Sequence, residues 1–299
     1  MASSVARILP PMVFQLPDGL VAEAKPIARE LAVRKGSAVE ALLLGLLVRR
    51  NELLMLVLSE QRIDGGALRK DLDAKVTAMP PNEGGDDNLK FLINQAVLLA
   101  SKYSKSSPSL DHLTVALLEN HPNSATKYLE ANKVRIEDAR RMARNEAVAD
   151  GSNEQPELTA RRLARRIEQR VRIKFSPTML NKLWILAEQY LPGPDRNPII
   201  RQFLQTIAAE ALQSRLPQDL RNLQVLLTEA KVKASRAEAL GSSSTRRRTI
   251  EDEIKHREYY LRSLADWIDA QKAIEVTDDA VRVAISILAR MPPEKIDLF

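Results

Sequence analysis

"SAVEALLLGLLVRRNELLMLVLSEQRI" (residues 37–63) and "PSLDHLTVALLENHPNSATKYLEANKV" (residues 108–134) decide the fold of this chain, because the second stretch repeats the first 71 positions later without a gap. In both stretches, apolar residues recur at the three- and four-residue spacing of amphipathic helices. The matched positions are Leu42 with Leu113, Leu46 with Leu117, Leu47 with Leu118, Leu58 with Leu129 and Ile63 with Val134. The sequence therefore predicts a helical unit of about 70 residues that occurs twice, and its two copies should pack together because neither buries its apolar face alone.

The composition favours an all-α protein of about two domains. The chain has 299 residues, of which 44% are hydrophobic, 28% charged and only 4% aromatic. It contains no cysteine. Disulfides, zinc-thiolate sites, iron–sulfur clusters and thiol nucleophiles are therefore excluded.

Breaks rich in Pro, Gly and Asn divide the chain. "MPPNEGGDDN" (residues 79–88) separates the two copies, and "ADGSNEQPE" (residues 149–157) follows the second. A short strand is expected where Val171, Ile173 and Phe175 alternate. Ser176 and Pro177 should begin the next helix, and Thr277 should cap the closing one. The expected segments are an extended arm (1–17), a double-repeat domain (18–150), a helical unit (157–216), a hairpin (217–273), and a closing helix and tail (274–299).

The hairpin is predicted from a strict 4-3 spacing of apolar residues, which is typical of an antiparallel coiled coil. The spacing runs through Leu216, Leu220, Leu223, Leu227, Ala230, Ala234 and Ala237 on one arm and through Ile250, Ile254, Leu261, Leu264 and Ile268 on the other. Trp267 lies near the base and residues 241–248 form the tip. Self-association or coupling to an ATPase is expected to use Leu220, Leu223, Leu227, Ile254, Leu261 and Trp267.

The net charge of +6 is concentrated in "ARRLARRIEQRVRIK" (residues 160–174) and "TRRRT" (residues 245–249). Such clusters suit either a solvated helix face and loop, or a partner with phosphates or acidic side chains. No aromatic residues interleave with the arginines to stack on bases. A solvated face is therefore the favoured interpretation, and a basic structural protein associated with nucleic acid is the alternative.

No membrane span or secretion signal is expected. No stretch of 18 apolar residues is free of charge, and Pro10, Pro11 and Pro17 interrupt the apolar N-terminus. Together with the lack of thiols, this favours the cytoplasm.

"VEALLLGLL" (residues 39–47) and "LDHLTVALL" (residues 110–118) resemble the "GTEHLLLGLL"-like run found in each half of the N-domain of Clp-type AAA+ unfoldases and disaggregases. Glu40 and Asp111 stand at the acidic position and His112 at the histidine position, whereas Val39 and Leu110 replace the family's threonine. Residues 157–216 resemble an AAA+ lid subdomain more weakly, and residues 217–273 a coiled-coil middle domain. The closing segment is similar to an interdomain linker or to a second lid fragment.

The nucleotide-binding core of that family is missing. No G-x-x-x-x-G-K-[ST] sequence occurs, and glycine is nowhere followed by lysine. ATP hydrolysis requires glycine amides around the phosphates and a lysine on the terminal ones. We therefore expect no enzymatic activity and no cofactor. The three histidines do not show metal-ligand spacing, so no metal site is expected either.

Two sets of residues are expected to bind protein. Glu40 and Asp111 each lie in the first turn of a helix, where a carboxylate stabilises the helix dipole; the resemblance also implies that they bind basic or arginine-phosphorylated clients. The resemblance further implies a hydrophobic groove near the first helix that accepts a partner helix, and Phe14, Leu16, Leu20 and Ala24 would line it here.

Together these features predict a non-catalytic Clp-like adaptor or scaffold within a bacterial secretion or proteostasis machine. Its N-domain would bind a client, an adaptor or a Clp-type ATPase. Its C-terminal part would mediate assembly, including the formation of a homo-oligomer.

Overall fold

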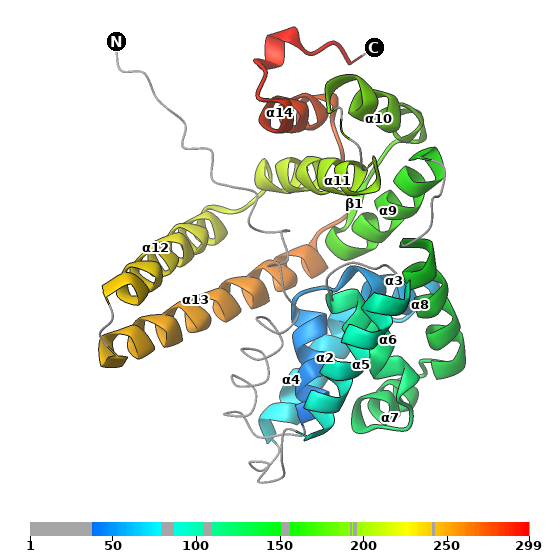
Figure 1. Ribbon diagram of the computed structural model, residues 1–299, viewed down its shortest axis with the longest axis vertical. Coiled ribbons are helices and arrows are strands. Elements are labelled where there is room, and N and C mark those ends of the chain that lie inside the picture. The colour runs from blue at the N-terminus through cyan, green and yellow to red at the C-terminus, as the bar shows by residue number, and fades with distance from the viewer. Residues whose placement is uncertain are drawn as a thin grey trace.

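The computed structural model describes residues 38–78, 87–103, 109–150, 156–191, 193, 196–240 and 243–298 (Figure 1). Helices dominate this part of the chain: α2 to α14 account for almost all regular structure, and the two strands have two residues each. The predicted all-α fold is confirmed. Figure 1 shows a lower group of helices, an upper group, and a long pair, α12 and α13, that reaches away from both.

The N-terminal body comprises the helices α2 (Ala38–Val48), α3 (Glu52–Glu60), α4 (Gly65–Ala78), α5 (Asp87–Tyr103), α6 (Leu110–Glu119), α7 (Ser124–Ala131) and α8 (Ile136–Asp150). They enclose one apolar cluster in which Leu43, Leu46, Leu72, Leu113 and Leu117 are fully buried. The leucine runs of both repeated stretches therefore form core, because helix α2 is buried along its length and α6 along most of its length.

The repeated stretches fold into helices of the same order. Corresponding helices begin at nearly the same separation: α6 begins 72 positions after α2, α7 begins 72 after α3, and α8 begins 71 after α4. Helices α3 and α7 also end alike: Arg62 and Lys133 have φ values of 58° and 67°, and the N–H one residue further bonds back to Leu58 and Leu129. The two stretches also pack against each other, since α2 contacts α7 and α3 contacts α6.

The C-terminal body comprises α9 (Pro156–Val171), β1 (Ile173–Lys174), α10 (Pro177–Tyr190), α11 (Arg196–Gln213), α12 (Gln218–Leu240), α13 (Ser243–Ala270), β2 (Ile274–Glu275), α14 (Asp278–Ala289) and the 3-10 turn η1 (Pro293–Lys295). The predicted strand is present but short. It pairs in parallel with β2, which the sequence pattern did not reveal, and Ile173 lies opposite Ile274. The expected caps Ser176 and Thr277 accept the N–H groups of Met179 and Ala280.

The segments 157–216, 217–273 and 274–299, which the sequence suggested as separate units, share one apolar core. Phe203 and Leu204 of α11, Leu264 of α13 and Ile285 of α14 belong to the same buried cluster. The C-terminal body is therefore one packed unit from which the distal part of the hairpin projects.

Helices α12 and α13 form the predicted hairpin and lie side by side (Figure 1). Leu220, Leu227, Ala234 and Ala237 of α12 are buried at the expected spacing, and Leu223 and Ile254 are half-buried. At the base, Leu261 packs against the core of the N-terminal body and Trp267 against that of the C-terminal body. The residues predicted for assembly thus pack within the hairpin and at its base, and their part in an association with another chain stays a prediction.

Candidate functional site

The contact between the two bodies is mainly ionic, apart from Leu261 of α13, which packs against the apolar core of the N-terminal body. Helix α9 packs against α3, and α13 packs against α2 and α4. Four of the five α9 arginines pair with carboxylates of the N-terminal body: Arg162 with Glu146, Arg165 with Glu60, Arg166 with Asp111, and Arg170 with Glu52. The fifth, Arg161, pairs with Glu157. The favoured interpretation of this basic run as a solvated face is therefore wrong for Arg162, Arg166 and Arg170, which the N-terminal body covers, whereas Arg161 and Arg165 remain 50% and 58% exposed.

Glu52 is the centre of this contact, and its side chain is only 4% exposed. Its carboxylate lies 3.0 Å from Arg170 Nη1 and 3.3 Å from Arg201 Nη1, and accepts a hydrogen bond from Gln205 Nε2 at 3.2 Å. Burial alone would raise the pKa of Glu52, but the charges of Arg170, Arg201 and Arg166 outweigh it and lower the pKa to about 2. Glu52 is therefore ionised throughout the physiological pH range.

Asp111 belongs to the same contact. It forms an ion pair with Arg166, whose side chain is fully buried, and accepts a hydrogen bond from Asn51 Nδ2 at 2.8 Å. Asn51 also caps α3 by accepting the N–H of Leu54, and its side-chain oxygen accepts the hydroxyl of Thr114. Asp111 thus ties both repeated stretches to α9 rather than facing solvent.

Glu40, at the matching position of the first stretch, has a different environment. It is 5% exposed, and Lys75 Nζ lies 3.2 Å from its carboxylate. Lys75 in turn lies 5.0 Å from the centre of the Tyr128 ring. Neither predicted acid is presented openly to a client.

The residues predicted to line a groove near the first helix, Phe14, Leu16, Leu20 and Ala24, lie outside the described residues.

A second ionic cluster surrounds Asp269 at the end of α13. Asp269 pairs with Arg50 and lies 3.5 Å from Arg69 Nη2, which also contacts Asp266. The carboxylate lies so close to the start of α4 that a Cβ at Gly66 would come within 2.6 Å of it. The glycine at position 66 therefore allows α13 to dock on the N-terminal body.

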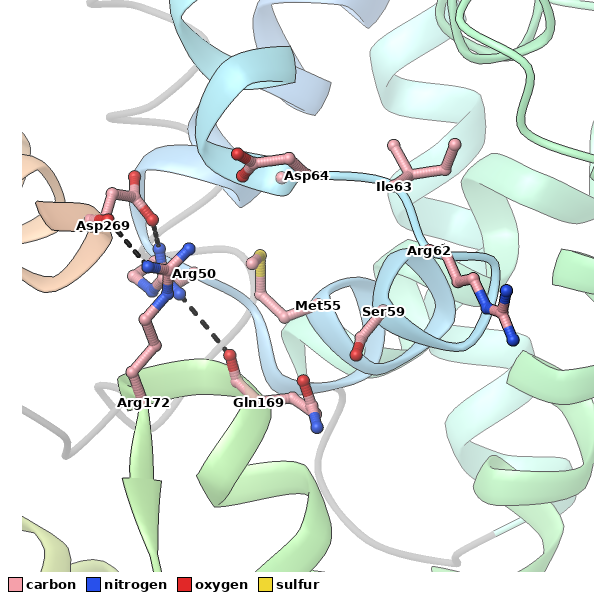
Figure 2. Close-up of a pocket in the computed structure, with 10 residues that line it drawn as sticks. Arg50, Met55, Ser59, Arg62, Ile63, Asp64, Gln169, Arg172 and Asp269 are labelled. Carbon is pink, nitrogen blue, oxygen red and sulfur yellow. Dashed lines mark hydrogen bonds and ion pairs between the residues drawn. The ribbon is translucent and has the colours of Figure 1, made fainter. Parts of the chain in front are cut away.

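A pocket of about 290 Å³ opens beside this cluster, and we call it the inter-body pocket (Figure 2). Its lining residues are Arg50, Met55, Ser59, Arg62, Ile63, Asp64, Gly65, Gln169, Arg172 and Asp269. Arg50, Arg62 and Arg172 all adopt left-handed backbone conformations, with φ values of 47°, 58° and 51°. Figure 2 shows the guanidinium groups of Arg50 and Arg172 side by side near Asp269, and Arg62 at the far rim.

Four of the exposed large apolar side chains of the described C-terminal body lie on the hairpin, and the other two are Leu158 and Ile185. Val225, Leu226 and Val232 of α12 are each 45% exposed, and Tyr259 of α13 is 61% exposed. Val225 and Val232 are seven residues apart and therefore lie on one face of α12. Sequence reasoning concentrated on the buried seam and missed this outer face.

Neither a metal site nor a membrane span is found in the described parts of the chain: no three potential metal-ligating side chains gather there, and no helix is long and apolar enough to cross a bilayer.

In comparisons with known proteins, no family model, curated protein or solved structure matches this chain. The resemblance to Clp-type N-domains therefore stays a prediction.

Proposed function

We propose that this protein is a non-catalytic scaffold that binds a partner protein along the outer face of the hairpin, as an adaptor of the Clp type would. The observation that carries the proposal is the exposed set Val225, Leu226 and Val232 on a helix that reaches away from both bodies (Figure 1). Apolar side chains grouped in this way on a projecting element mark a surface for another polypeptide.

The packing of the hairpin supports this role. Among the described elements, helix α12 makes its main contacts with α13 alone, whereas α13 also rests on α2 and α4. No described helix therefore covers the outer face of α12, which lies beside a rigid support. Arg221, Lys233 and Arg236 are exposed around the apolar residues, and Glu229 is the exposed acid among them. A partner helix with apolar and acidic residues would complement this face.

The arginines of α9 favour a protein partner over a nucleic acid. Because carboxylates pair with them across the contact between the bodies, they do not form an open cationic track. Binding to DNA or RNA through phosphates would need such a track and would depend steeply on salt.

Site-specific photo-crosslinking in the native cells tests the proposal. A photoreactive residue at position 226 or 232 is expected to yield a discrete adduct with one partner, and Val225→Ser/Leu226→Ser/Val232→Ser should abolish co-purification of that partner. The matched control is Val148→Ser/Leu158→Ser/Ile185→Ser, which changes side chains of similar exposure elsewhere, at 48%, 49% and 47%. An unchanged partner yield with the hairpin variant, or an equal loss with both, would contradict the proposed surface.

The non-catalytic part of the proposal has its own test. Purified full-length chain with Mg²⁺ and ATP or GTP is expected to release no phosphate above the rate of a buffer blank. Measurable turnover that co-purifies with the chain through two orthogonal columns would overturn this part.

A further inference from the structure

We propose that the inter-body pocket binds a small molecule through a phosphate or carboxylate group. This site is separate from the outer face of the hairpin and does not depend on the scaffold function. The pocket lies where α3, the start of α4, the end of α9 and the end of α13 meet (Figure 2).

The charge of the lining is the first argument. Three arginines and two aspartates line the pocket, and both aspartates are already engaged. Asp269 is held by Arg50 and Arg69, and Asp64 accepts the N–H groups of Gly66 and Ala67 at the start of α4. The lining therefore has an excess of positive charge that a bound anion would neutralise.

The environment of Arg50 supports this argument. Burial lowers the pKa of Arg50, and the nearby charges of Arg172 and Arg69 lower it further against the opposing effect of Asp269. Like charges gathered around a buried guanidinium are unfavourable unless an anion compensates them.

Arg172 supplies suitable donors. Its Nη1 donates to the backbone carbonyls of Asp269 at 2.7 Å and Gln271 at 3.3 Å, which fixes the side chain. Its Nε and Nη2 make no hydrogen bond to the described residues. These two N–H groups form the parallel pair that binds a carboxylate or phosphate in bidentate fashion. The hydroxyl of Ser59 and the side-chain amide of Gln169 lie in the same lining and are likewise without partners among the described residues.

The rest of the pocket suits the body of a small ligand. Met55 and Ile63 contribute an apolar wall, and Gly65 leaves space where a Cβ would approach Met55 Cε to 2.7 Å. The volume of about 290 Å³ is at the lower end of the range for small-molecule sites. The pocket is thus too small for a folded segment of a partner.

Isothermal titration of the full chain with inorganic phosphate and with succinate, at constant ionic strength, tests the proposal. The wild type should bind at least one of the two saturably, and which one binds assigns the group. Arg172→Gly should weaken that binding about tenfold or more, because it removes the bidentate donors. Glycine adopts the φ of 51° at position 172 without strain.

Arg290→Gly is the matched control. Arg290 has a φ of 54°, lies at the end of α14 and does not line the pocket, so this variant loses the same charge at the same backbone conformation. It should bind as the wild type does. No saturable binding of either anion, or an equal loss in both variants, would overturn the proposal.

A second pair of variants covers the case in which Arg172→Gly does not fold. Arg62→Gly should reduce the affinity about threefold because Arg62 lies at the rim of the pocket. Lys133→Gly, at the matching helix end 71 positions later, should leave it unchanged. Equal affinities for the two variants would contradict the assignment of the pocket.

Discussion

The two repeated stretches join each other through apolar side chains, whereas together they join the C-terminal body mainly through charged ones. Leu46 and Leu117 lie at the centre of a continuous apolar core, while Glu52, Asp111 and Arg166 meet at the contact between the bodies. Apolar burial is non-directional and tolerates small shifts in packing. Ion pairs with hydrogen-bonding geometry fix a relative orientation but destabilise strongly when one partner is lost. The charged contact is therefore the part of the molecule most sensitive to single substitutions.

Glu52→Gln is expected to have the largest effect, because it leaves Arg166, Arg170 and Arg201 without their shared carboxylate charge. The free energy of unfolding should fall by about 3–5 kcal/mol, measured by urea denaturation at pH 7. The control is Glu60→Gln, which removes an ion pair with Arg165 at a more exposed site and should cost about 1 kcal/mol or less. Equal losses would contradict the difference between the buried and exposed parts of the contact.

Substitutions at matched positions test the apolar packing between the two repeated stretches. Leu46→Ala and Leu117→Ala should each lower the free energy of unfolding by about 3 kcal/mol, because both side chains are fully buried and each leaves a cavity. Urea denaturation of the two variants should give values within about 1 kcal/mol of each other. A large difference would show that only one of the two stretches belongs to the cooperative core.

The depressed pKa of Glu52 predicts an acid-sensitive contact. Because the folded-state pKa is about 2 and the ordinary value is 4.5, Glu52 contributes its stability above pH 4.5 and loses it as the pH falls toward 2. Between pH 7 and pH 3 the wild type should lose about 2 kcal/mol more stability than Glu52→Gln does. Urea denaturation of both proteins at the two pH values measures this difference, and parallel losses would mean that Glu52 titrates normally.

The smallest effect concerns the docking of α13 on α4. Gly66→Ala should cost about 1.5 kcal/mol, because the new methyl group meets the carboxylate of Asp269, which Arg50 and Arg69 hold in place. Gly65→Ala should cost less, since its methyl group meets only the flexible end of Met55. Thermal unfolding of both variants compares them, and a larger loss for Gly65→Ala would contradict the role of Asp269.

The acids at matching positions show where sequence reasoning reaches its limit. Glu40 and Asp111 have the same place in the two stretches, yet Glu40 pairs with Lys75 of α4 and Asp111 with Arg166 of α9. Their partners lie 35 and 55 residues away, so no local pattern could distinguish them. The same holds for Glu52, which from sequence alone is an ordinary acid in the first turn of a helix.

The sequence by itself determined the helices, the helix caps at Ser176 and Thr277, and the hairpin, because these depend on spacing and on hydrogen bonds within a few residues. It also excluded any chemistry that needs a thiol. Only the tertiary structure decided that three of the α9 arginines are covered, that three left-handed arginines line one pocket, and that the outer face of α12 is exposed. The reason is physical: a charge is stabilised by whatever surrounds it in space, and those surroundings come from residues far apart in the chain.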